Sequence, residues 1–364
     1  MEKTQISSIQ LSLILSGFLF GSTVIVAPVQ EAKNDAWLAL IIGGIAGTLL
    51  MGVYVAIALL NPSKTLVDIL KEKFGKVIGT IFAILYIWYF LHIASLVLRN
   101  FGEFVCTTTF PQTPIIVVIG LFAVVLLYAV NSGIEVLGRL SELLMPVVPL
   151  VILITAFSII TVHDFTAFLP ILENGIAPVF KAAFGYISFP FGETVAFLML
   201  FPHLNDKKNL KKIVFISSVA INIIGIIIFF RDTFVLGNNL IERATFIPHL
   251  TSLLIPGLNV DPLVDINLLI GGGIKVSVCI YAAARALSQI AGINDYRKLT
   301  GAILTFCVVL SIWLYENILE MFSWVGRVWS YYSLPFQIVI PLLLLLLSLK
   351  KGKPSNAKTE SLKQ

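Results

Sequence analysis

The sequence predicts an all-α integral membrane protein of ten transmembrane helices, arranged as two sets of five that cross in opposite directions. Of its 364 residues, 58% are hydrophobic and only 12% are charged, and the mean hydropathy is +0.96. A soluble domain of this length needs far more charge to cover its surface. Apolar runs of eighteen or more residues recur along the chain, and each can cross a hydrocarbon core of roughly 30 Å as a helix.

Turn and breaker signals separate these runs, as at Asn61-Pro62 and Asp261-Pro262. The predicted spans cover residues 9–29, 36–60, 77–99, 114–131, 143–161, 177–202, 212–231, 265–288, 299–315 and 332–349. The longest connection, residues 232–264, is too polar to span and is expected to form short helices over one face. Residues 1–349 are therefore predicted to form one transmembrane domain, with one repeat at about 9–161 and the second at about 177–349.

The distribution of positive charge supports this topology. With the N-terminus in the cytoplasm, 18 lysines and arginines fall on the cytoplasmic side and 6 on the other side. Basic residues mark cytoplasmic loops in membrane proteins, so both termini are predicted to be cytoplasmic. The basic cytoplasmic loops then account for the pI near 9.0, which does not indicate a nucleic-acid partner. Residues 350–364 are expected to form a disordered basic tail that can rest on the anionic lipid bilayer.

The sixth predicted span contains three residues that are costly in a helix surrounded by lipid. It reads GYISFPFGETVAFLMLF from Gly185 to Phe201. Pro190 cannot donate a backbone hydrogen bond, and Gly192 lets the backbone leave helical geometry cheaply. Glu193 adds an ionisable group, which costs about 2.5–3.5 kcal/mol at the centre of a membrane helix on insertion scales. Irregular backbone at this depth survives only inside protein or beside a wet cavity, so an interrupted, cavity-lining helix is predicted.

The first predicted span carries a second anomaly, SGFLFGSTVIVAP, in which Gly17, Gly21, Ser22 and Thr23 cluster and Pro28 closes the segment. The first and sixth spans head the two sets of five and cross in opposite directions. Interrupted helices at matching positions of inverted halves indicate a central binding site. Their free amide and carbonyl groups suit a ligand that has both a carboxylate and an ammonium group.

These features predict a set of ligand-binding residues. Close packing between helices is the alternative explanation for the same residues. The predicted residues are Gly17, Gly21, Ser22, Thr23, Ser188, Phe189, Pro190, Gly192 and Glu193. Proline and glycine are common in membrane helices, and the glycines of the first span would also allow close helix packing, as Gly43 and Gly47 are expected to do in the second.

The motifs resemble those of a known family. FPFGE at Phe189 to Glu193, the following TVAFLMLFPHL and the N-terminal ISSIQLSLILSGFLFGSTVIVAP are similar to the spore germination permeases, the B subunits of nutrient germinant receptors in spore-forming bacteria. The resemblance implies the LeuT-like, inverted five-plus-five fold of the amino acid–polyamine–organocation superfamily. It also implies residence in the spore inner membrane beside an A-type membrane subunit and a C-type lipoprotein, and recognition of a nutrient that is often an amino acid.

The eighth predicted span adds further candidates. Ser277 and Tyr281 are four residues apart and share one helical face, and the resemblance places them at ligand-flanking positions. Lys275 is expected seven to ten residues inside this helix. It either snorkels to the outer interface or meets Glu193 or a ligand carboxylate. His92 is interpreted as a hydrogen-bonded histidine of the bundle, with a proton-carrying role as the alternative.

Three functions remain open on these observations. The first is a nutrient-sensing receptor subunit that binds its ligand between the first, third, sixth and eighth helices and signals to its partner subunits. The second is an amino acid/proton symporter with Glu193 as the proton-linked group. The third is a structural scaffold subunit with a vestigial cavity, in which Glu193→Gln and Gly192→Leu would leave the nutrient response intact. The sequence contains no catalytic triad, phosphate loop, paired intramembrane carboxylates or metal-ligand spacing. An enzyme is therefore not predicted, and no cofactor or metal is expected.

Overall fold

The structure of the chain is a computed structural model that describes residues 5–23, 29–158, 168–241, 243–255 and 261–350. Most of the predicted basic tail, residues 351–364, lies outside this part. In chain order, with η for 3-10 and π turns, the elements are α1 (Ser8–Thr23), η1 (Gln30–Asp35), α2 (Ala36–Leu60), α3 (Leu66–Phe74), α4 (Lys76–Thr108), α5 (Ile115–Ser132), α6 (Ile134–Leu144), α7 (Val147–Ser158), α8 (Ala177–Tyr186), η3 (Ile187–Phe191), η4 (Gly192–Met199), η5 (Phe201–His203), η6 (Lys207–Asn209), α9 (Leu210–Ile241), α10 (Ile247–Leu254), α11 (Asp261–Ala291), α12 (Arg297–Trp313), α13 (Ile318–Trp324), η7 (Val325–Trp329), α14 (Ser330–Leu334), η8 (Pro335–Val339) and α15 (Ile340–Lys350).

The predicted all-helical class is confirmed. Within the described ranges, eight helical segments are long and apolar enough to cross a membrane. The helices at the first and ninth predicted spans are shorter, since α1 has 16 residues and α12 has 17. The length criterion therefore does not by itself establish ten crossings, and that number stays a prediction.

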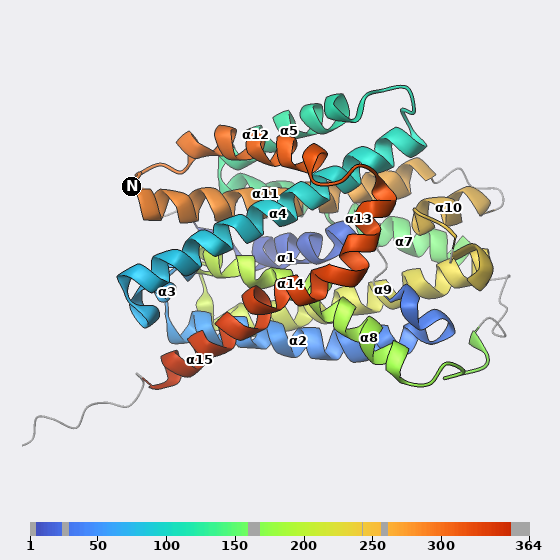
Figure 1. The fold of residues 1–364 in the computed structure, drawn as a ribbon, viewed down its shortest axis with the longest axis horizontal. Helices are drawn as coiled ribbons and strands as arrows, with labels where there is room; N and C mark the ends of the chain where they lie inside the picture. Colours follow the sequence, from blue (N-terminus) through green and yellow to red (C-terminus); the bar gives the residue numbers. More distant parts are fainter. Residues whose placement is uncertain (1–4, 24–28, 159–167, 242, 256–260, 351–364) are drawn as a thin grey trace, which may run out of the picture.

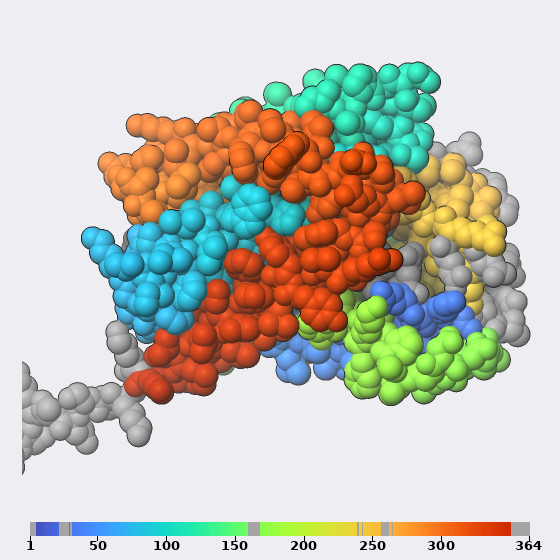
Figure 2. Space-filling model, in the orientation of Figure 1, coloured from blue at the N-terminus to red at the C-terminus, as the bar shows by residue number. Residues whose placement is uncertain are grey.

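The helices lie side by side in one bundle, and both described ends of the chain are at the same end of it, together with α3 (Figure 1). We call this the termini end. Burial differs between the membrane-crossing segments, each taken over its own most apolar stretch of 18 residues. In this stretch, 83% of the residues are buried in α11 and in the α8–η4 segment, but only 28% are buried in α9. The former two elements are therefore interior, whereas α9 is peripheral. The segment from α13 to α15 runs diagonally across one face of the bundle beside α4 (Figure 2).

The glycines of α1 serve helix packing. A Cβ atom on Gly21 would lie 2.2 Å from the carbonyl oxygen of Gly271, and one on Gly17 would lie 2.5 Å from Cδ1 of Ile274. Because α1 is continuous from its first to its last residue, the interruption predicted for the first span does not occur at these glycines. The absence of a side chain there lets α1 and α11 approach closely. Pro28, which was expected to close the span, lies outside the described part.

Helix α9 extends beyond residue 231, the predicted end of the seventh span, into the connection 232–264, with a kink at Gly237 (φ 63°, ψ 166°) before it ends at Ile241. The short helix α10 follows, as expected for this connection. A hydrogen bond of 2.8 Å between His249 Nδ1 and Asp265 Oδ1 joins α10 to α11. Residues 256–260 of the connection are not described. The described part of this connection thus contains a short helix, as predicted, together with the end of α9.

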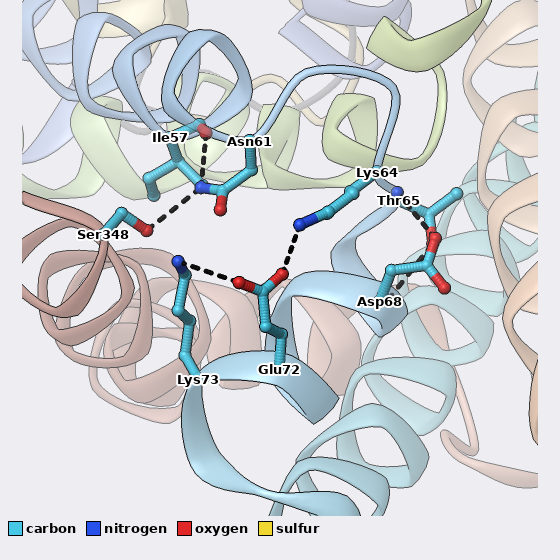
Figure 3. Close-up of polar contacts among 8 residues, drawn as sticks. All are labelled: Ile57, Asn61, Lys64, Thr65, Asp68, Glu72, Lys73 and Ser348. Atoms are coloured by element: carbon cyan, nitrogen blue, oxygen red, sulfur yellow. Dashed lines mark hydrogen bonds and ion pairs between the residues drawn. The ribbon is translucent and has the colours of Figure 1, made fainter. Parts of the chain in front are cut away.

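Polar contacts hold the termini end together around the turn between α2 and α3 (Figure 3). Asn61 Nδ2 donates to Ser348 Oγ over 3.0 Å, which links α2 to α15. Glu72 of α3 pairs with Lys64 and Lys73. The hydrogen bond from Lys64 is the main reason why the pKa of the Glu72 carboxyl falls from 4.5 to about 2. A lowered carboxyl pKa gives stability above pH 4.5 that is lost as the pH falls through about 2, so these exposed pairs persist at neutral pH.

The close contact between α1 and α11 leads to a prediction for Gly21→Ala. The added methyl group would meet the backbone of α11, and we expect a loss of about 1–3 kcal/mol in the free energy of unfolding. Gly52→Ala is the matched control, because nothing lies within 4 Å of a Cβ atom at this helical position. Thermal unfolding of the purified variants measures both. Equal melting temperatures for the two variants would contradict the assigned packing role of Gly21.

Candidate functional site

The sixth span is broken where the sequence places Pro190. α8 passes into η3, in which Phe189 has φ −140° and ψ 108°, an extended conformation. A residue that precedes proline is disfavoured from helical geometry, and proline itself has no N–H to donate. The chain then continues as the 3-10 helix η4 from Gly192. The predicted interruption of the sixth helix is thus present, and it places Phe189 and Glu193 on either side of the break.

The backbone carbonyls released by the break are paired by other helices. Gln337 Nε2 donates to Ser188 O over 2.8 Å and to Tyr89 Oη over 2.6 Å. Tyr54 Oη lies 3.1 Å from Gly192 O and 2.7 Å from Gln337 O, both of which can accept its hydrogen bond. A Cβ atom on Gly192 would lie only 2.0 Å from Gln337 Oε1, so glycine is needed for this approach. Buried carbonyls without a partner would cost several kcal/mol at membrane depth, and this network avoids that cost.

Next to the break, Glu193 and Lys275 form a buried ion pair. Lys275 Nζ contacts Glu193 Oε2, and their side chains are 0% and 1% exposed. The ammonium group also lies 4.5 Å from the ring centroid of Phe189 and 5.2 Å from that of Phe18. Both rings are within the range at which an aromatic face attracts a cation. The ammonium is therefore enclosed by a carboxylate and two aromatic rings, contributed by η4, η3 and α1.

The position of Lys275 differs from the snorkelling interpretation. The membrane-crossing segment of α11 begins at Asp265, as predicted, so Lys275 lies ten residues inside it, or about 15 Å along the helix axis. Its side chain is 0% exposed and its charge is paired with Glu193 inside the protein, so it does not snorkel to the interface. The alternative that the sequence left open, a contact with Glu193, is the one that the structure contains.

A small cavity adjoins this pair. Its volume is about 10 Å³, which is room for about one water molecule. It is lined by Ile93, Leu96, Val97, Asn100, Phe189, Glu193, Val325 and Trp329. Asn100 Oδ1 and Trp329 Nε1, an acceptor and a donor, are buried and have no hydrogen-bond partner among the residues that the structure describes. The cavity thus has unpaired polar groups but no space for an amino acid in this conformation.

Of the remaining predicted residues of the first and eighth spans, those whose side chains the structure describes do not line the cavity. Gly17 and Gly21 face α11, as described above. Ser22 and Thr23 are in the last turn of α1, and their side chains lie outside the description. Tyr281 Oη contacts Nε2 of His203 over 2.9 Å. Ser277 is buried within α11 but, like Tyr281, is absent from the lining of this cavity.

His92 is buried in α4 among aromatic side chains. Its Nδ1 atom lies 3.2 Å from Tyr332 Oη, and its ring centroid is 5.2 Å from that of Trp324. Its Nε2 atom is buried without a hydrogen-bond partner in the described ranges. No contact between His92 and Glu193 is present in those ranges, and a proton-carrying role for His92 stays a prediction.

Several residues of the site were not predicted from the sequence. They are Phe18, Tyr54, Tyr89, Asn100, Trp329 and Gln337. Asn100 and Gln337 carried a signal, because an amide side chain beside or within an apolar run needs an internal partner. The aromatic residues carried none, since they look like ordinary core or interface residues in a sequence of this composition.

Comparison with known proteins assigns the family. A family model described as spore germination protein matches residues 5–321. Spore germination protein KB of Bacillus subtilis (strain 168) is 34% identical over 379 residues, which cover 100% of both chains. The chain belongs to the spore germination protein family. Spore germination protein YndE of the same organism is 23% identical over 59% of this chain and 60% of its own length.

Two solved structures confirm the transporter-like fold of this family member. MhsT in complex with L-phenylalanine has a TM-score of 0.64 at 14% identity and covers 96% of this chain and 99% of its own. Mhp1, a nucleobase-cation-symport-1 family transporter with bound bromovinylhydantoin, has a TM-score of 0.68 at 10% identity, with coverages of 94% and 78%. Identities this low show the fold alone. Together with the family, they agree with a multi-pass membrane protein that is not an enzyme.

The ion pair predicts strongly non-additive effects of mutation. Glu193→Gln or Lys275→Met alone leaves one buried charge without its partner, and we expect each to lower the free energy of unfolding by about 3–5 kcal/mol. The double variant removes both charges and should regain most of this loss. Lys181→Met is the control, since its pair with Glu31 is exposed and worth at most about 1 kcal/mol. Unfolding in an SDS titration measures all four variants, and additive losses would contradict the pairing.

Proposed function

We propose that the chain is the nutrient-sensing B subunit of a spore germinant receptor and binds a small nutrient, an amino acid, at the break of the sixth helix. The observation that carries the proposal is the buried pair of Glu193 and Lys275 at an interrupted helix, in a chain of the spore germination protein family. A carboxylate fixed beside aromatic rings in the membrane interior is complementary to the ammonium group of an amino-acid ligand.

The size of the cavity supports a sensing mechanism. Because it holds about one water molecule, a nutrient must bind a second arrangement in which the break and the facing helices α4 and η7 lie further apart. The nutrient then shifts the equilibrium between the two arrangements by its difference in affinity for them. Partner subunits that contact the moving helices would read this shift as the germination signal.

The proposed assembly follows the family. The chain crosses the spore inner membrane ten times, as two inverted repeats at about 9–161 and 177–349, with both termini in the cytoplasm. It acts beside an A-type membrane subunit and a C-type lipoprotein. The grouping of basic loops with the chain ends at the termini end supports this orientation. The outer segment around α10 and the basic loops are the proposed partner surfaces.

A transporter-like fold also favours a second function, an amino acid/proton symporter. The two functions differ in whether the ligand accumulates. Purified protein should show a ligand-dependent thermal shift with one or a few members of a panel of amino acids and sugars. The proposed sensor takes up none of these compounds into liposomes, with or without a proton gradient. Gradient-dependent accumulation of a compound would show that the protein is a symporter and would contradict the sensor function.

Substitution of Glu193 tests the assignment of the site. In spores that contain the partner subunits, we expect Glu193→Gln to lower nutrient-triggered germination by at least about tenfold relative to spores that contain an equal amount of the unsubstituted protein, because the charged partner at the break is lost. Glu142→Gln, at an exposed position of α6, is the control and should respond normally. Germination is measured as the loss of spore refractility at a series of nutrient concentrations. A normal response of Glu193→Gln at normal protein level would overturn the assignment.

A further inference from the structure

The surroundings of Lys275 Nζ match the chemistry that recognises a free ammonium group. Glu193 supplies a carboxylate, and the rings of Phe189 and Phe18 lie 4.5 Å and 5.2 Å from the nitrogen. We call these three side chains the ammonium cage. Carboxylates and aromatic faces bind primary ammonium groups of ligands through the same charge-assisted hydrogen bonds and cation–π attraction. The cage itself therefore does not require that the ammonium belong to a lysine.

Lys275 reaches the cage through a flexible tether. Its ammonium is carried by four methylene groups from the buried helix α11, and the whole side chain is 0% exposed. A lysine that becomes fixed loses about 2 kcal/mol of rotamer freedom. Lys275 Nζ can donate three hydrogen bonds, whereas Glu193 is its one ion-pair partner in the described ranges. The lysine thus fills the cage without using all of its hydrogen-bonding capacity.

The small cavity continues from the cage and offers further polar contacts. Glu193 and Phe189 belong to both. Beyond them, Asn100 Oδ1 and Trp329 Nε1 are buried with unused hydrogen-bonding capacity in the described ranges. A ligand whose ammonium occupied the cage could extend towards these two groups once the cavity opened. Lys275, which enters from α11, has no contact with either residue that the structure records.

We propose that Glu193, Phe189 and Phe18 form the binding site for the primary ammonium group of the nutrient, and that Lys275 is a tethered competitor that occupies this site until the nutrient displaces it. The inference rests on the proposed function, because it assumes that the nutrient binds at the helix break. It names the ligand class as primary amines, amino acids among them, and it excludes sugars. Only the molecules in which Lys275 has left the cage can bind the nutrient. The apparent affinity is therefore the intrinsic affinity multiplied by the fraction of such molecules.

The opposite role for Lys275 gives the opposite result on mutation. If Lys275 binds the nutrient's carboxylate, its removal weakens binding. If it competes for the cage, its removal strengthens binding. Lys275→Gln keeps a hydrogen-bond donor near Glu193 but removes the competing charge. We expect this variant to need about three- to tenfold less nutrient for half-maximal germination, whereas a higher requirement would overturn the proposal.

A direct test uses the fragment of lysine that Lys275→Ala removes. n-Propylammonium has the same three carbons and nitrogen as the missing atoms. It should raise the melting temperature of purified Lys275→Ala saturably, by about 2–4 °C. n-Propanol, the neutral analogue, should give no such shift, and neither should n-propylammonium with the wild type or with Lys275→Ala/Glu193→Gln. Sodium chloride at equal concentration controls for ionic strength.

The outcomes separate this inference from the proposed function. If Lys275→Ala fails to accumulate, n-propylammonium in the growth medium should restore its level. No shift and no restoration, or an equal shift in the double variant, would overturn the ammonium cage. Loss of the nutrient response in Glu193→Gln would still support the proposed function in that case. A normal response of Glu193→Gln would instead remove the proposed function and this inference with it.

Discussion

Glu193 and Lys275 place opposite charges in contact where neither side chain reaches solvent. A charge left alone at such a position costs several kcal/mol, so each residue holds the other in place. Through this contact the broken sixth helix is coupled to α11, and α11 is in turn packed against α1 through Gly21 and Gly271. Any motion that separates these helices must supply a new partner for both charges. The ammonium group of a ligand can be that new partner for Glu193.

The second constraint is the pairing of backbone groups at the break. Helix geometry ends at Phe189, and the carbonyls of Ser188 and Gly192 are then paired by side chains from the last and second helices of the bundle. Gln337 contacts both the break and Tyr89, whose ring stacks on Phe336 at 4.6 Å. The break is therefore supported by residues far from it in sequence. Movement of the break would also disturb α2, α4 and η8, which gives the site a route to the outside of the bundle.

Much of this organisation was predictable because it depends on local chemistry. Apolar runs reveal the membrane helices, and Pro190, Gly192 and Glu193 reveal the break, since each is costly in a lipid-facing helix for a separate reason. The cluster at Gly17 and Gly21 was ambiguous, because glycine permits both a break and a close helix contact, and only the position of α11 decides between them.

The partner of Lys275 could not be predicted from the sequence, because it depends on which way the side chain faces. The predicted start of the span at residue 265 agrees with the membrane-crossing segment of α11, but only the packing of the bundle shows that Lys275 faces the interior. The hydrogen bonds from Tyr54 and Gln337 to the break could not be predicted for another reason. Tyr54 is 138 positions from Gly192 in the sequence, and Gln337 is 149 positions from Ser188, so only the three-dimensional arrangement of the helices shows that they meet.

The most direct test of this account is the position of the Lys275 ammonium group in the nutrient-free protein. An electron cryo-microscopy map of the receptor complex in lipid nanodiscs, at side-chain resolution, would locate it. We predict that Nζ lies within about 4 Å of the Glu193 carboxylate and between the rings of Phe18 and Phe189. A lysine side chain that extends towards the lipid interface, with Glu193 paired elsewhere, would contradict the coupling on which the proposed site depends.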